Sequence, residues 1–187
     1  MEILAHTLWT TAVAKKANLE AKKKNKKFKL DLLWAAFWGI FPDLFNLLIP
    51  MSLFLLGLFS GVYTFESFAA TRIIVNAYDI SHATYLLSHS LIIFVLVFSL
   101  VWFILKRPPW VMLGWAFHIL IDIPSHSILY YSTPFLYPLS NYRFPYGVSW
   151  SNQWFMIINY LALALVWGTI LFKKYKHKII KNKTKNG

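Results

Sequence analysis

Three side chains that can bind a metal or move a proton stand at intervals of four in HILIDIPSHS: His118, Asp122 and His126. On a helix this spacing places them on one face, with a drift of only about 40° at each step. They lie in a mostly apolar segment, residues 110–131. An aspartate at the centre of a membrane helix costs about 2.5–3.5 kcal/mol, so such residues usually pair, face water or bind a ligand.

Asp43 in GIFPDLF, His89 in LSHSL and His6 in AHTLW are polar residues in similarly apolar surroundings. Imidazole and carboxylate suit zinc, manganese or non-haem iron, and a site without thiolate is typical of catalytic metal. The chain has no cysteine. We therefore expect a metal at His118, Asp122 and Asp43, with His6 and His89 as further candidates.

Each candidate also has a simpler interpretation. The pair of His118 and Asp122 could be a hydrogen bond that satisfies two buried groups. Asp43 could cap a helix after Pro42, and His89 could be an interfacial residue at a helix start capped by Ser88. Two other residues, His82 and Asp79, are expected in an interfacial loop.

The composition predicts a membrane protein. Of 187 residues, 58% are hydrophobic and 14% are charged, which leaves too little polar surface for a soluble domain. Apolar segments near 30–59, 86–105, 110–131 and 154–172 are long enough to cross a bilayer. We expect one integral membrane domain over residues 1–187. It is an all-α, polytopic helical bundle of about four transmembrane helices plus an N-terminal helix over residues 3–14.

The formal net charge of +12 comes mainly from lysines in 15–29, 106–107 and 173–185, each beside an apolar segment. Such clusters are typical of cytoplasmic flanks that contact anionic lipid, so membrane lipid is the expected partner and nucleic acid is not. Both termini would then be cytoplasmic. Residues 60–85 are expected to be amphipathic, and 132–153 to form an ordered outer loop in which Arg143 meets a substrate phosphate or a lipid headgroup.

A depth estimate groups the polar residues further. Counted from the basic flanks at about 1.5 Å per residue, Asp43 and Asp122 lie roughly 20 Å deep. By the same count His118 lies at roughly 13 Å and His89 at roughly 25 Å, and His6 reaches roughly 13 Å if the N-terminal helix enters the bundle. His126 also reaches roughly 25 Å. Two carboxylates and several imidazoles are therefore expected within one layer in the outer half of the bundle, where a water-filled pocket could admit lipid laterally.

The segments AHTLW, GIFPDLF, LSHSL, HILIDIPSHS and TPFLYPLSNYRF resemble the YdjM type of prokaryotic inner-membrane protein, to which metal-dependent hydrolase activity is attributed. The Pro-Asp and His-three-Asp elements are similar to those of zinc-dependent phospholipase C proteins, which are helical and bind zinc through His and Asp. The resemblance implies that the metal ligands are His6, Asp43, His89, His118 and Asp122. Phe45 stands where the family often has a second aspartate, which argues against a multinuclear site.

The expected activity is hydrolysis of a phosphoester, or another ester, on a lipid-like substrate by metal-activated water. Zinc is the first choice of cofactor, with manganese or iron as alternatives, and His126 is the candidate general base. Another class of function stays open: a small transporter or proton relay that uses the same buried residues. A third is a scaffold in which the metal is structural.

Overall fold

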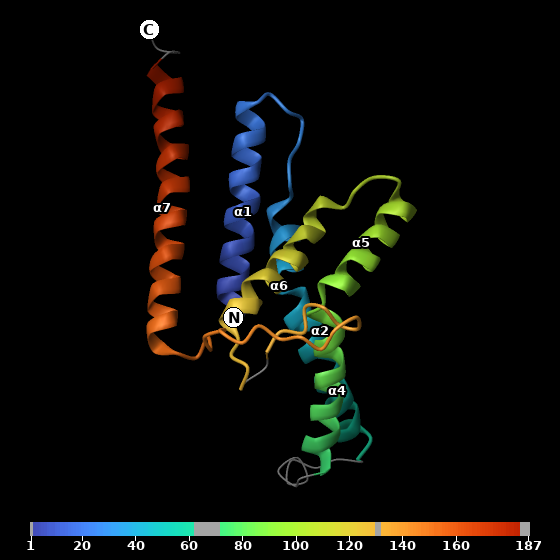
Figure 1. Ribbon diagram of the computed structural model, residues 1–187. Coiled ribbons are helices and arrows are strands. Elements are labelled where there is room, and N and C mark those ends of the chain that lie inside the picture. Colours follow the sequence, from blue (N-terminus) through green and yellow to red (C-terminus); the bar gives the residue numbers. More distant parts are fainter. Residues whose placement is uncertain (1, 62–71, 130–131, 184–187) are drawn as a thin grey trace.

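The computed structural model describes residues 2–61, 72–129 and 132–183 (Figure 1). In these ranges every regular element is helical, so the predicted all-α class is confirmed for the described chain. The elements are α1 (Ile3–Lys23), α2 (Leu32–Phe59), α4 (Arg72–Ser88), α5 (Leu91–Leu105), the short 3-10 helix η1 (Trp110–Met112), α6 (Leu113–Ser125) and α7 (Gln153–Lys183).

Helix α2 is the central element, because it packs against α1, α4 and α6. Helix α1 also packs against α7, where the Trp9 indole donates to Asn159 Oδ1 at 2.8 Å and the Trp167 indole donates to the Leu8 carbonyl at 3.2 Å. Figure 1 shows the C-terminal ends of α1, α5 and α7 toward the same end of the molecule. The three lysine clusters singled out in the sequence flank these ends.

Polar side chains fix the starts of three helices. Glu2 accepts hydrogen bonds from amides of the first turn of α1, Asp31 does so for α2, and Ser90 for α5. Each supplies an acceptor to amides that have no partner within the helix. Helix α5 ends at Lys106, which takes the left-handed conformation with φ of 54°.

The expected span 86–105 is not one helix. Helix α4 ends at Ser88 and α5 begins at Leu91, and the axes of Ile80–Ser88 and Leu91–Leu105 differ by 64°. The break follows from Ser90, whose hydroxyl bonds two α5 amides in place of a continued helix. This bend carries His89, whose side chain is fully buried.

Small residues let α1, α2 and α6 approach closely. A Cβ added at Gly114 would lie 2.8 Å from the Ala35 carbonyl oxygen, and one added at Gly39 would lie 2.4 Å from Thr10 Oγ1. Close backbone approach through Gly, Ala and Thr is typical of helix interfaces in membranes. It brings together the three helices that carry most of the candidate ligands.

Within the described ranges, one helix segment, Gln153–Tyr175 in α7, is long and apolar enough to cross a membrane, and the bent α4–α5 pair would be a second if it is one broken span. The apolar stretches Leu32–Leu48 and Trp110–Ser125 are shorter. The expected 110–131 segment therefore ends its helix at Ser125, and residues 130–131 lie outside the described residues.

The N-terminal helix was expected over residues 3–14 and continues to Lys23. Within the expected 60–85 connection, residues 72–85 belong to α4 and 62–71 lie outside the described residues. Residues 132–152 hold turns and no helix or strand, as expected for the outer loop.

We expect Gly114→Ala to destabilise the bundle, because the new methyl group would push α6 away from the α2 backbone. Overpacking of this kind costs about 1–3 kcal/mol, which should lower the thermal unfolding midpoint in detergent, followed by circular dichroism. The matched control is Gly168→Ala in α7, where an added Cβ has no atom within 4 Å. Equal midpoints for both variants would show that the close approach does not stabilise the fold.

Candidate metal centre

Four of the predicted side chains converge between the helices: Asp43 from α2, His89 from the α4–α5 bend, and His118 and Asp122 from α6. Each offers one ligand atom, and these atoms all lie within 4.8 Å of one another. His118, His89 and Asp122 are fully buried, while 24% of the Asp43 side chain is exposed. The structure therefore brings together, from separate helices, four of the five predicted ligands, in a group that could hold a metal ion.

The spacing of these atoms fits a small cation. His118 Nε2 lies 3.1 Å from Asp122 Oδ2, 3.3 Å from His89 Nε2 and 3.6 Å from Asp43 Oδ1. His89 Nε2 lies 3.5 Å from both Asp43 Oδ1 and Asp122 Oδ2. A tetrahedral ion with bonds of about 2.0–2.1 Å requires ligands about 3.3–3.4 Å apart. The donor set and its spacing therefore suit zinc or a similar divalent ion.

The outward nitrogens of two imidazoles are held by polar partners. His118 Nδ1 lies 2.7 Å from the Gly39 carbonyl oxygen, and His89 Nδ1 lies 2.9 Å from Ser88 Oγ. Since a carbonyl only accepts, the hydrogen of neutral His118 is on Nδ1 and the lone pair of Nε2 faces the cluster. Metal-binding histidines in proteins are oriented in this way by outer partners.

His6 reaches the same cluster from α1, so the N-terminal helix does enter the bundle. Its Nε2 lies 3.1 Å from Asp122 Oδ1, and its ring stacks on His118 with centroids 3.6 Å apart. The side chain is fully buried, and neither ring nitrogen makes a hydrogen bond of normal geometry. His6 is therefore adjacent to the four-residue group but faces the other oxygen of Asp122.

His126, the candidate base, lies on that same side. Its Nε2 is 3.6 Å from Asp122 Oδ1, and its Nδ1 is 3.1 Å from the Tyr85 hydroxyl. The Ser125 hydroxyl also donates to Asp122 Oδ1, at 3.3 Å. Sequence reasoning missed Tyr85, which lies in the last turn of α4, although its spacing of four residues from His89 could have indicated that the two are neighbours.

Two of the simpler interpretations do not hold. Asp43 lies inside α2, whose N-cap is Asp31, so it does not cap a helix. His89 is buried beyond the end of α4, and the residue that caps α5 is Ser90 rather than Ser88. His82 and Asp79 lie in helix α4 and not in a loop, and the side chain of His82 is exposed.

The outer loop is fastened on both sides of the cluster. Its first arm meets the start of α5, where the Leu91 amide donates to the Phe135 carbonyl at 3.0 Å. Its second arm meets the end of α6, where the amides of Val148 and Trp150 donate to the carbonyls of Pro124 and Ser125 at 2.9 and 2.8 Å. The loop therefore lies next to His89 and to His126.

One buried polar atom of this loop, Arg143 Nη1, has no hydrogen-bond partner within the described part of the chain. Burial lowers the pKa of the Arg143 guanidinium, and the nearby Tyr85 acts in the opposite direction. A buried guanidinium nitrogen without an acceptor is costly. Arg143 Nη1 is therefore a donor still available to an acceptor, close to Tyr85.

No protein-family model, curated protein or solved structure matches the chain. The similarity to the YdjM type of protein therefore stays a prediction from short motifs. The chemistry of the site follows from the donor atoms and their geometry.

We expect Gly147→Ala to loosen the outer loop, because the added Cβ would lie 2.0 Å from the His126 carbonyl oxygen. The amides of Val148 and Trp150 should lose protection from hydrogen exchange, measured by mass spectrometry on the peptide that contains them. Gly168→Ala again serves as the control. Unchanged protection in Gly147→Ala would mean that the loop is not packed against α6.

Proposed function

We propose that the chain is an integral membrane hydrolase that uses one divalent cation, held by Asp43, His89, His118 and Asp122. The observation that supports this most directly is the convergence of their four ligand atoms within 4.8 Å. Zinc suits the donor set best, and manganese or iron are alternatives. The resemblance to YdjM-type proteins points in the same direction.

Large apolar side chains on the outside of α5 and α7 support the membrane location. In water, exposed apolar surface of this extent would favour aggregation, whereas lipid tails solvate it. We propose a multi-pass protein of about four spans in the cell membrane, with both termini and the lysine clusters on the cytoplasmic side. The exposed residues include Val95, Leu96, Leu100, Phe103 and Ile104 on α5, and Trp154, Ile158, Leu161, Leu165 and Phe172 on α7.

A divalent cation would also balance the charges of the cluster. Asp43 and Asp122 bring two carboxylates into a largely buried space, where an uncompensated charge is costly. When bound, the cation would supply a Lewis acid and lower the pKa of a water molecule to about 7. The residues around it would then orient the substrate and accept the proton.

His126 and Tyr85 are suited to proton transfer. If His126 Nδ1 donates its hydrogen to the Tyr85 oxygen, the lone pair of Nε2 faces Asp122 and the cluster. An imidazole in this position can take a proton from attacking water and return it to the leaving group. We therefore retain His126 as the proposed general base, held in orientation by Tyr85.

Arg143 favours a phosphoester over a neutral ester. Its buried Nη1 lacks an acceptor, and a guanidinium matches the oxygens of a phosphoryl group. The outer loop that carries it is fastened beside the cluster, so a phosphate bound there would lie near the proposed cation. We propose a lipid-like phosphoester as the substrate.

Metal analysis of the detergent-purified chain tests the cation. We expect about one equivalent of metal in the native chain, and strong depletion in His89→Ala and Asp122→Ala. His82→Ala removes an imidazole from the exposed face of α4 and should retain the metal. A native chain without metal would contradict the proposal and favour a proton relay, and a metal that survives Asp122→Ala would place the site elsewhere.

Substitutions of Arg143 test whether the substrate is a phosphoester. We expect Arg143→Gln to lower kcat/KM for a phosphodiester roughly 10- to 100-fold, because a charge-assisted hydrogen bond is lost. Arg143→Lys keeps the charge without the planar fork and should lose less. Metal content and the hydrolysis of a neutral carboxylic ester should not change, and an equal loss on both substrates would argue against a phosphate contact.

A further inference from the structure

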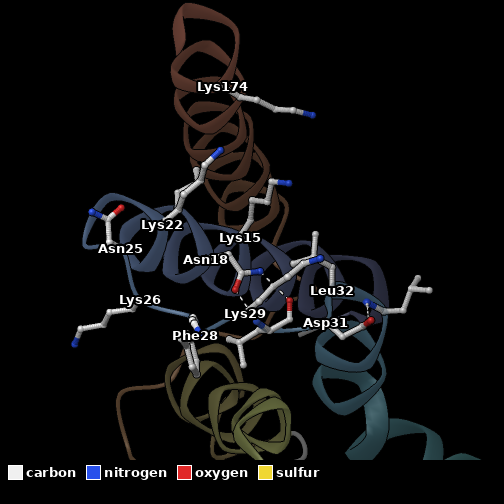
Figure 2. A pocket seen from close by; sticks show the side chains of 14 residues that line it. Lys15, Asn18, Lys22, Asn25, Lys26, Phe28, Lys29, Asp31, Leu32 and Lys174 are labelled. Atoms are coloured by element: carbon white, nitrogen blue, oxygen red, sulfur yellow. Dashed lines mark hydrogen bonds between the residues drawn. The ribbon is translucent and has the colours of Figure 1, made fainter. Parts of the chain in front are cut away.

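A concave surface lies far from the metal cluster. Lys22, on its wall, is sixteen residues along α1 from His6, or about 24 Å of helix. This basic groove has a volume of about 890 Å³ and is bounded by α1, the segment that joins α1 to α2, the start of α2 and the end of α7. Figure 2 shows its side chains.

The charge of the groove is strongly positive. Its lining includes six lysines and one acidic residue, Asp31, which gives a formal charge of +5. Asp31 accepts hydrogen bonds from two amides at the start of α2. Among the described residues, none of the groove lysines forms an ion pair. The six are Lys15 and Lys22 on α1, Lys26, Lys27 and Lys29 on the connecting segment, and Lys174 on α7.

Hydrogen bonds hold the lysine-bearing segment near both of its ends. Asn18 Nδ2 donates to the Leu30 carbonyl at 2.8 Å, and the Leu30 amide donates to Asn18 Oδ1 at 2.6 Å. The Lys26 amide donates to the Ala21 carbonyl at 2.9 Å. The connecting segment thus holds three lysines beside those of α1, and an anion bound among them would reduce the repulsion between their like charges.

Apolar side chains share the groove with the lysines. Leu19, Phe28, Leu32 and Leu33 are part of its lining, and Phe28 and Leu33 are 38% and 82% exposed. The apolar segment Gln153–Tyr175 ends beside it, since Lys174 belongs to that last turn. A ligand that fits such a lining carries an anionic group next to an apolar chain.

We propose that the basic groove binds the phosphate headgroup of an anionic phospholipid, with the acyl chains against its apolar side chains. Lysines near a membrane surface attract anionic headgroups, and ammonium groups bind phosphate as point charges. The shared chemistry is a phosphate anion, and the apolar lining favours a lipid as its source over free phosphate. This site requires the membrane location but not the metal or the hydrolase activity.

Native mass spectrometry of the full chain in neutral detergent tests this proposal. The chain is titrated with phosphatidylglycerol, with phosphatidylcholine and with inorganic phosphate. We expect preferential binding of phosphatidylglycerol and an affinity roughly 100-fold lower in Lys22→Gln/Lys26→Gln/Lys29→Gln. The matched control, Lys16→Gln/Lys23→Gln/Lys24→Gln, removes the same charge from lysines outside the groove and should lose far less.

The variant Asn18→Ala distinguishes a specific lipid-binding site from general attraction between lysines and anionic lipid. It leaves the net charge unchanged but releases the connecting segment, so we expect weaker phosphatidylglycerol binding at unchanged helical content. Equal losses in the two triple-lysine variants would overturn the proposal, because they would show only general charge attraction. It would also be overturned if inorganic phosphate bound as tightly as the lipid, or if phosphatidylcholine bound as well as phosphatidylglycerol.

Discussion

The buried carboxylate of Asp122 is the group around which the helices are arranged. Its side chain is fully enclosed, and its two oxygens face different imidazoles: Oδ2 faces His89 and His118, and Oδ1 faces His6 and His126. An ionised carboxylate in such a place requires close compensation, because the desolvation of an isolated charge is far more costly than a typical fold can tolerate. The N-terminal helix, the α4–α5 bend and α6 each place an imidazole beside this carboxylate.

Part of this arrangement could be predicted because it depends on local spacing. His118 and Asp122 share a helix face at any tertiary arrangement, and the apolar context of Asp43 and His89 indicates burial. Counting residues from the basic flanks placed them roughly 13–25 Å deep, since helix rise is constant. The all-α fold class was predicted from the apolar composition and the long apolar segments, and every regular element in the described ranges is a helix.

Other features had a weak local signal or none. The bend at His89 falls on polar residues, Ser88, His89 and Ser90, but the sequence does not tell which serine caps the next helix, and the hydrogen bonds of Ser90 decide it. The partner of His118 Nδ1 is a backbone carbonyl, which any residue could supply. The two outer-loop arms and the pairing of Asn18 with Leu30 link residues whose proximity depends on the tertiary fold. Which oxygen of Asp122 faces which ring is likewise set by packing.

Gly39 links helix packing to the chemistry of the cluster. The space where its side chain would stand is filled by Thr10 of α1, and its carbonyl accepts from His118. A shift of α1 along α2 would therefore move the carbonyl that fixes the tautomer of His118, and with it the basicity of the nitrogen that faces Asp122. Mechanical strain between the first two helices would thus be transmitted to the imidazole of His118, at the centre of the cluster.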